Sequence, residues 1–268
     1  MFKLFKKIEF PQQSNRMKTI ANTKIAKEVY NFSKSKNLKF LLYQRFNWIN
    51  KYIEEDDVGI EVGSGAGFLK DFIKNKNLKL TDMSNDEHLD FKNIDAQNTE
   101  FKNESFDYVI SSNMIHHLPY PIKFFREMNR ILKKNGKLII FEAYCSIFFQ
   151  VATVIMKHEG FDFTINVWDE KSPKSDEKDV WAGNIAVSNL IFDDKNKFNE
   201  NLGHLFSLEY EKLVECLVFL NSGGVTSKTF CIPMNNFFMN ILHIIDKFLV
   251  KIFPKLFCMG RRIVLVKK

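Results

Sequence analysis

Residues 58–68 read VGIEVGSGAGF, and this stretch decides the fold. Its first five residues form the short apolar run of a buried strand, and glycines follow at positions 63, 65 and 67. Such glycines allow positive φ angles and let the backbone approach a ligand at a helix N-terminus. Glu61 places a carboxylate inside the strand, which is costly unless a partner satisfies it. The stretch predicts a strand, a ligand-binding loop and a helix beginning at Phe68. A tight turn without a ligand is the simpler alternative.

Strand and helix signals alternate after this loop. Strands are predicted at Leu78–Asp82, weakly at Leu89–Asp95, and at Phe106–Ser112 and Lys137–Ala143. Pro121 begins a predicted helix that ends near Leu132, before a turn at residues 133–136. This alternation predicts a parallel sheet covered by helices on both faces.

The alternation stops after Tyr144. Residues 145–203 are predicted to be an irregular insertion at the carboxyl side of the sheet, where open α/β sheets bind ligands. Leu205–Tyr210 and Arg262–Val266 are expected as the last two strands, with a helix at Phe237–Phe253 between them. The expected organisation is a mostly helical lead-in (1–56), a ligand-binding core (57–144), the insertion as a lid (145–203), and C-terminal elements that complete the same domain (204–268).

The composition is that of a soluble globular protein. Of its 268 residues 45% are apolar and 26% charged, which excludes a disordered chain or a disulfide-stapled miniprotein. The net charge is +7, but Arg supplies only 6 of the 39 basic residues, and we expect no nucleic-acid partner. The four Cys are scattered, so no metal site is predicted and a reducing compartment is expected. Without a signal peptide or a convincing membrane span, we expect a cytoplasmic protein.

Polar residues follow each of the next predicted strands. Asp82 ends the second strand about 20 residues after the glycines, where a carboxylate can accept two ribose hydroxyls. Asp95 and Ala96 end the third, and Asn113 follows the fourth. Either Asp taken alone also fits a turn. The order and spacing of the whole set are better explained as contacts to one cofactor.

These ordered pieces resemble the class I S-adenosylmethionine-dependent methyltransferases, specifically the small-molecule group called type 11. The matching pieces are IEVGSGAGF, LTDMS, IDAQNTEFKNESFDYVISSNMIHHL and FFREMNRILKKNGKLIIFE, within roughly residues 57–144. The resemblance implies an α/β fold with a Rossmann-like seven-stranded sheet. That sheet would be mostly parallel with an antiparallel last strand, with helices on both faces and the insertion after the fifth strand.

The resemblance also implies S-adenosyl-L-methionine as cofactor. It places Glu61 and the glycine loop near the methionine end, Asp82 at the ribose, Asp95 and Ala96 at the adenine, and Asn113 at the methionyl side. The implied cofactor-binding residues are Glu61, Gly63, Ser64, Gly65, Gly67, Asp82, Met83, Asp95, Ala96 and Asn113. Asn135 stands where the family usually has a second Gly, and Asn tolerates positive φ.

The rest of the chain is similar to a narrower bacterial group of methyltransferases associated with genes for surface polysaccharides or lipid-linked sugars. The matching pieces are KHEGFD at residues 157–162, Trp181, and SGGV at residues 222–225. This similarity implies a small-molecule acceptor, such as a saccharide or a lipid-linked intermediate.

Methyl transfer from a sulfonium requires an aligned acceptor and, for a hydroxyl acceptor, a base. His116 and His117 follow the fourth strand, close to where the methyl group should emerge. His158 and Glu159 in the insertion are the rival candidates. Packing at the sheet edge explains the first pair equally well, and a solvated loop explains the second. The Asn-Pro-Pro-Tyr type of motif used in methylation of nucleobase amines is missing, which disfavours that reaction.

Two segments raise the question of peripheral contact with the inner membrane surface. In residues 1–10 (MFKLFKKIEF), Phe2, Phe5 and Ile8 share one helical face and lysines lie on another. A frayed end is the alternative there. In the Phe237–Phe253 helix a narrow polar stripe crosses an apolar cylinder, and its residues are Asn240, His243, Lys247 and Lys251. Such a basic amphipathic helix is suited to an anionic membrane surface, but a core helix beneath the sheet is the favoured prediction. A non-catalytic binding module remains a competing function, as does a nicotinamide-dependent oxidoreductase, although the oxidoreductase fingerprint requires a different glycine spacing.

Overall fold

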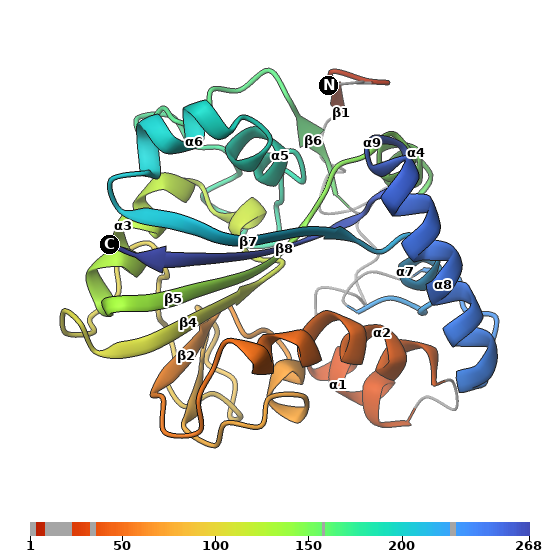
Figure 1. Cartoon of the computed structure of the whole chain (residues 1–268), viewed down its shortest axis with the longest axis horizontal. Coiled ribbons are helices and arrows are strands. Elements are labelled where there is room, and N and C mark those ends of the chain that lie inside the picture. The colour runs from red at the N-terminus through yellow and green to blue at the C-terminus, as the bar shows by residue number, and fades with distance from the viewer. Residues whose placement is uncertain (1–3, 9–22, 33–35, 157–158, 226–228) are drawn as a thin grey trace.

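The computed structural model describes residues 4–8, 23–32, 36–156, 159–225 and 229–268. One sheet has the strand order β3-β2-β4-β5-β8-β7 (Figure 1). Its strands are β2 (Gly59–Val62), β3 (Leu78–Thr81), β4 (Phe106–Ser112), β5 (Leu132–Ala143), β7 (Phe206–Val214) and β8 (Gly260–Lys267). Two short strands, β1 (Lys7–Ile8) and β6 (Phe161–Asp162), pair with each other outside this sheet.

The direction of the strands confirms the expected α/β class. Neighbouring strands from β3 through β2 and β4 to β5 are parallel, whereas β8 runs antiparallel to both β5 and β7. Ile60 on β2 is level with Val109 on β4, which is level with Leu138 on β5, and all three are fully buried. The sequences of these strands are near-continuous apolar runs because both faces of the sheet are covered.

The sheet has six strands where seven were expected, because Leu89–Asp95 does not form a strand. Its contact with β3 is an isolated bridge between Thr81 and Phe91. The Asp90 carboxylate accepts a hydrogen bond from the Leu80 N–H at 2.9 Å. A side chain therefore takes the donor that a further strand would have paired with, and the ladder does not continue.

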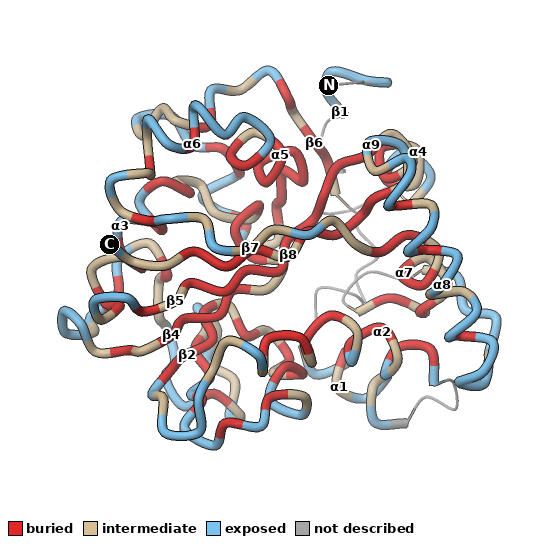
Figure 2. Tube along the Cα trace, viewed as in Figure 1, coloured by how far each residue is buried: buried red, intermediate tan, exposed pale blue. Residues whose placement is uncertain are grey.

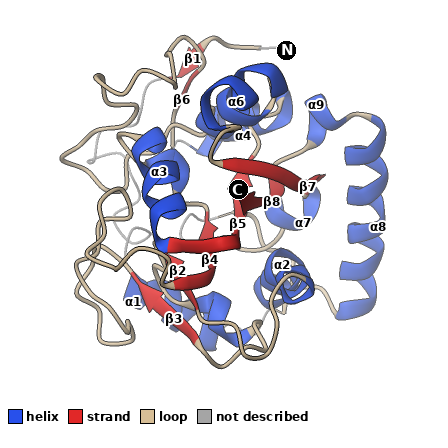
Figure 3. Cartoon of the chain, turned by 60° about the vertical axis from the view of Figure 1, so that its left-hand side comes forward, coloured by secondary structure: helices blue, strands red, loops and turns tan. Residues whose placement is uncertain are grey.

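Helices cover the two faces of the sheet (Figure 3). The α-helices are α1 (Thr23–Phe32), α2 (Asn37–Phe46), α3 (Pro121–Ile131), α4 (Ile147–Met156), α5 (Val187–Phe192), α6 (Lys195–Leu202), α7 (Leu217–Leu220), α8 (Asn236–Ile252) and α9 (Pro254–Phe257). Short 3₁₀ helices are η1 (Asn47–Lys51), η2 (Phe68–Asp71) and η3 (Ile115–His117). One apolar core joins a sheet face to α3, α5 and α6, and another joins the opposite face to α1, α2, η1 and η2.

Two local predictions around the core differ from the structure. The helix expected from Phe68 is only the single turn η2, because the following segment is held by side chains. The Asn75 amide donates hydrogen bonds to three backbone carbonyls, including that of Asp57 at 2.9 Å. The turn expected at residues 133–136 lies within β5 as an irregularity, where the pairing with β4 shifts and Asn135 has a φ of 62°.

The insertion is more regular than expected, since residues 145–203 contain α4, β6, α5 and α6.

At the N-terminus, Lys7 and Ile8 form the strand β1 and not a helical turn. The predicted amphipathic helical face is therefore wrong for these residues, and Phe2 lies outside the described residues. Along the described segments of the chain, no helix is both long and apolar enough to cross a bilayer.

The prediction of a core helix at Phe237–Phe253 is wrong in its environment. The helix α8 forms at the expected place but lies at the edge of the molecule, with much of its surface exposed (Figure 2). Among its buried residues is Asp246, whose carboxylate accepts hydrogen bonds from the backbone N–H groups of Cys216, Leu217 and Val218 at the start of α7. This polar contact turns a polar side chain of α8 inward.

Candidate active site

A cavity of about 720 Å³ lies at the carboxyl ends of β2, β3, β4 and β5. It brings together most residues that the sequence predicted for a site. Those lining it are Glu61, Gly63, Ser64, Gly65, Asp82, Met83, Asp95, Ala96, Asn113, His116, His117 and Glu159. Gly67 is not among the lining residues, and His158 lies outside the described residues.

The glycine loop has the conformation that its composition predicts. Gly63 and Gly65 have φ angles of 68° and 51°, in the left-handed region that favours glycine. A Cβ on Gly63 would lie 2.3 Å from Cγ of Met114, whereas a Cβ on Gly65 would meet no atom within 4 Å. Gly63 is therefore required by packing, and Gly65 presents bare backbone to the cavity.

Glu61 has a buried side-chain oxygen without a hydrogen-bond partner. The residue lies on β2 and is 2% exposed, and the unpartnered oxygen is Oε2. Burial raises the pKa of its carboxyl to about 8. An unpartnered carboxylate oxygen at the head of the glycine loop is suited to a cationic ligand group, which would restore the lost solvation.

Two aspartates are held in fixed orientations by backbone donors. Asp82 follows β3, and its Oδ2 accepts a hydrogen bond from the Gly65 N–H at 2.8 Å, which ties it to the glycine loop. Asp95 accepts a hydrogen bond from the Gln97 N–H at 2.8 Å. Both side chains line the cavity, so their remaining acceptor positions can meet a ligand's hydroxyl or amino groups.

His116, on η3, pairs with a buried glutamate. Its Nδ1 contacts Oε1 of Glu142, a β5 residue that is fully buried. Burial opposes protonation of His116, but Glu142 and then Glu159 outweigh it and raise the pKa of the imidazole to about 10. Glu142 also accepts a hydrogen bond from the Ile115 N–H at 2.8 Å, so the pair fixes η3 against the end of β5.

Glu159 of the insertion faces both histidines. Its carboxylate oxygens lie 3.7 Å from Nε2 of His116 and 3.9 Å from Nε2 of His117. Burial, and then the neighbouring His116 charge, lower the pKa of His117 to about 4, so this ring is neutral at pH 7. The three groups can share a proton, and with ligand atoms all within 4.8 Å they could also hold a cation.

The insertion is fixed directly onto η3. The Asn184 N–H donates a hydrogen bond to the His116 carbonyl at 2.8 Å, and the Ser175 hydroxyl donates one to the His117 carbonyl at 2.6 Å. Gly183 packs against both imidazoles, where a Cβ would lie less than 3 Å from either ring. Glu159 and the histidines therefore belong to one assembled cluster, although about 40 residues separate them in sequence.

Glu142 and Arg45 are among the charged residues of the site that sequence reasoning missed. Glu142 lies inside the apolar run KLIIFEA, and a buried acid in such a run is the same signal that singled out Glu61. Arg45 of α2 lines the cavity and pairs with Glu215, with 2.8 Å between Nη2 and Oε2. Nothing local marks Arg45, because its partner is 170 residues away.

The comparisons with known proteins agree with this geometry. A family model described as a methyltransferase domain matches residues 60–140, the part of the chain that carries the glycine loop, both aspartates and η3. This segment belongs to the type 11 class I S-adenosylmethionine-dependent methyltransferases, and S-adenosylmethionine is the cofactor of that domain. The unpartnered oxygen of Glu61 fits this cofactor, whose methionine end carries an amino group.

Individual proteins and solved structures resemble this chain only at low sequence identity or over part of its length. The demethylmenaquinone methyltransferase of Staphylococcus haemolyticus is 30% identical over 109 residues, which cover 40% of this chain and 42% of that protein. Among solved structures, an S-adenosylmethionine-dependent methyltransferase from Methanosarcina mazei aligns with a TM-score of 0.47 at 16% identity, over 82% of this chain and 96% of that one. A methyltransferase from Thermotoga maritima aligns with a TM-score of 0.47 at 16% identity, over 92% and 98%.

Proposed function

We propose that this protein is an enzyme that transfers a methyl group from S-adenosylmethionine to a small molecule. The observation that carries the proposal is that one cavity contains both the unpartnered Oε2 of Glu61 and the cluster of Glu159 with two histidines. The first is suited to hold a cationic cofactor, and the second to handle the acceptor's proton. A binding module would have no need of the second cluster.

The cofactor would occupy the glycine-loop end of the cavity. Glu61 would bind the amino group of the methionine part, with Gly65 and Asn113 beside it, since these residues line the same cavity. Asp82 would accept the ribose hydroxyls, and Asp95 with Ala96 would hold the adenine. Asp82 is suited to its role because the Gly65 N–H already fixes one of its oxygens.

The acceptor would enter between this end and the insertion. Asp176, Glu177 and Trp181 of the insertion line the cavity together with Tyr120. Carboxylates beside aromatic rings suit a hydroxyl-rich acceptor, because the carboxylates accept hydrogen bonds from its hydroxyls and the rings pack on its apolar faces. This supports a saccharide, or a lipid-linked intermediate carrying one, with residues 145–203 as the acceptor lid. The relative named for demethylmenaquinone makes a quinone-type acceptor the second candidate.

S-adenosylmethionine supplies an electrophilic methyl group on a sulfonium. The chain must orient the acceptor oxygen in line with that group and remove its proton. His116 is protonated through its contact with Glu142, so it cannot be the base, and it instead positions Glu159. We assign proton acceptance to Glu159 together with the neutral His117. S-adenosylmethionine would supply the methyl group that replaces the acceptor proton and would leave as its demethylated product, and the proton would remain on this pair.

The first test is ligand binding by calorimetry with S-adenosylmethionine, its demethylated product and NAD. We expect the first two to bind, and heat from NAD alone would overturn the proposal. The second test is transfer of labelled methyl from the cofactor to components of a cell extract, separated into saccharide, lipid and quinone fractions. If treatment with EDTA abolishes turnover, the cluster of Glu159 and the two histidines binds a cation and does not act by sharing a proton.

The proposed cellular site is the cytoplasmic face of the inner membrane, where a lipid-linked acceptor would be found. The segment 1–10 was the first candidate for this contact, but its described part forms β1 and packs against the insertion. The Leu4 and Phe5 N–H groups both donate hydrogen bonds to Gln150 of α4 at 3.2 Å. A membrane contact therefore has to be sought elsewhere on the surface.

A further inference from the structure

The helix α8 has its apolar residues outside. Seven large apolar side chains of this helix are exposed, and at about 100° per residue they occupy one arc of about 120°. They are Phe237, Phe238, Ile241, Ile244, Ile245, Phe248 and Ile252. Phe237, Ile244 and Phe248 are 68%, 63% and 60% exposed, while Asp246 on the opposite face is 2% exposed. The usual arrangement of an amphipathic surface helix is therefore reversed.

The exposed apolar surface continues beyond α8. Phe253 and Leu256 at α9 are exposed, and α9 is in contact with α8. We call this surface, made of α8 and α9, the α8 surface. Contiguous apolar areas of this kind on a folded protein mark a binding surface.

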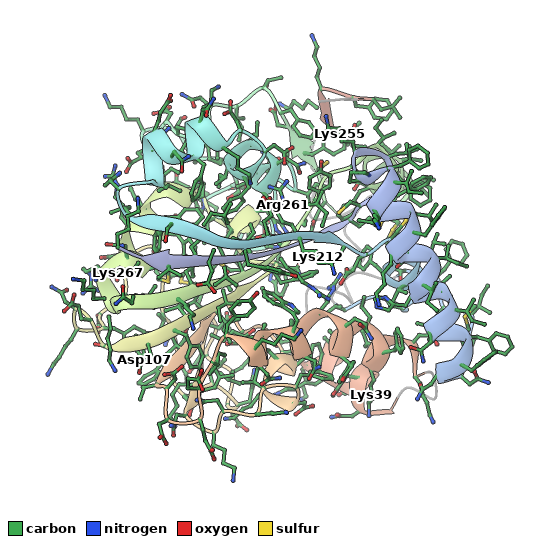
Figure 4. All side chains as sticks on the ribbon, in the orientation of Figure 1. Lys39, Asp107, Lys212, Lys255, Arg261 and Lys267 are labelled. Carbon is green, nitrogen blue, oxygen red and sulfur yellow. The ribbon has the colours of Figure 1, made fainter. Side chains whose placement is uncertain are left out.

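Basic residues border the α8 surface. Lys247 and Lys251 lie one turn apart at one edge of the apolar arc. Lys255 follows on α9, as Figure 4 shows. Asp246 is the only acidic residue of α8 and α9, and it is buried. Lys212 of β7 lies nearby: burial, and then the charges of Arg262 and Lys247, lower the pKa of its ammonium group. Within α8 and α9, the exposed charged side chains are therefore all positive.

The charges beside the α8 surface indicate which kind of partner binds there. A second copy of the chain would bring lysine borders together without an acidic residue of α8 or α9 to oppose them. An anionic bilayer satisfies both features, because apolar side chains enter the acyl boundary while lysines meet the headgroup phosphates.

We propose that the α8 surface docks the protein on a lipid bilayer that contains anionic phospholipids. The helix would lie in the plane of the interface, since its 17 residues do not span a membrane. Its buried face also reaches the cavity wall: Met239 packs in the same apolar cluster as Phe149, Phe219 and Met259, which line the cavity. Docking would place that apolar wall close to the bilayer. The inference does not depend on the proposed methyl transfer.

The test is co-sedimentation of the full chain with vesicles of phosphatidylcholine alone or with phosphatidylglycerol. We expect binding to the anionic vesicles that weakens with salt. The double variant Ile244→Gln/Phe248→Gln should bind at least ten-fold more weakly. Lys247→Gln/Lys251→Gln should bind about thirty-fold more weakly on anionic vesicles at low salt, at about 1 kcal/mol for each lysine. Val58→Gln, which removes an exposed apolar side chain elsewhere, is the matched control and should bind normally.

Two further measurements make the result decisive. Calorimetry with S-adenosylmethionine should give the same affinity for all variants, which separates docking from the cofactor site and shows that the variants are folded. Size-exclusion chromatography reports self-association. A wild-type chain that stays in the supernatant with anionic vesicles overturns the proposal. If that chain is instead a dimer that Ile244→Gln/Phe248→Gln converts to a monomer, the occupant of the surface is a second copy.

Discussion

Replacing Glu61 by Gln should make the free protein more stable and its cofactor binding weaker. The pKa of Glu61 is raised from 4.5 to about 8 by burial, so the folded state holds a proton that the unfolded state releases at neutral pH. Below pH 4.5 both states are protonated and there is no cost. The cost grows as the pH rises from 4.5 to 8, at about 1.4 kcal/mol per pH unit, so that it is about 3 kcal/mol at pH 7 as an upper value, and it levels off above pH 8.

Gln carries no such cost, so Glu61→Gln should raise the melting temperature at pH 8, by about 2–4 °C for each kcal/mol, and leave it unchanged near pH 4.5. The assay is thermal unfolding followed by circular dichroism across this pH range. Calorimetry should show that affinity for S-adenosylmethionine falls at least ten-fold, because a hydrogen bond to a charged group contributes about 1.5–3 kcal/mol.

Glu142→Gln is the matched control. Glu142 is as deeply buried as Glu61, but it accepts hydrogen bonds from the N–H groups of Ile115 and Ala143 and pairs with His116. Breaking such a buried pair costs about 3–5 kcal/mol, so this variant should be less stable at neutral pH. If Glu61→Gln also lowers the melting temperature at pH 8, or if its effect does not depend on pH, Glu61 is satisfied in the free protein and the reasoning fails.

Three further outcomes are expected. Asp82→Ala should weaken cofactor affinity by about 1.5–3 kcal/mol in calorimetry, and unchanged affinity would place the ribose elsewhere. Glu159→Gln should lower kcat while leaving the cofactor Kd within two-fold, and His117→Asn should do the same; equal loss of cofactor binding would show that these residues are structural. Asp246→Ala should lower the free energy of unfolding in urea by about 1–3 kcal/mol, because three backbone donors at the start of α7 lose their acceptor; no change would mean that water replaces the carboxylate.

The core of the fold and the cofactor end of the cavity could be predicted because their signals are local. The glycine loop follows its strand directly, and Asp82 follows the next one, so the parallel arrangement of β2 and β3 is enough to bring them together. The strand predicted at Leu89–Asp95 does not form, and the reason is equally local. The Asp90 carboxylate accepts the hydrogen bond of the Leu80 N–H, which a neighbouring strand would otherwise have accepted. Propensity alone does not report which of two acceptors a donor will choose.

The rest depends on contacts between distant parts of the chain. Glu159 meets the histidines only because the insertion folds back onto η3, and no periodicity encodes that return. The environment of α8 was misjudged for a related reason. An apolar helix with a narrow polar stripe looks like a core helix in sequence, but here Asp246 is turned inward by α7, which exposes the apolar face.

The pairing of β1 with β6 has a practical consequence for anyone who prepares this protein. β6 begins two residues after Glu159, and its strand partner is the N-terminal Lys7–Ile8 pair, reinforced by the Phe163 N–H donating to the Lys6 carbonyl at 3.1 Å. A fusion tag or a truncation at the N-terminus therefore acts on the segment that carries the proposed proton acceptor. Differently tagged preparations should differ in turnover while sharing one cofactor affinity, so rates are comparable only between samples with the same N-terminus.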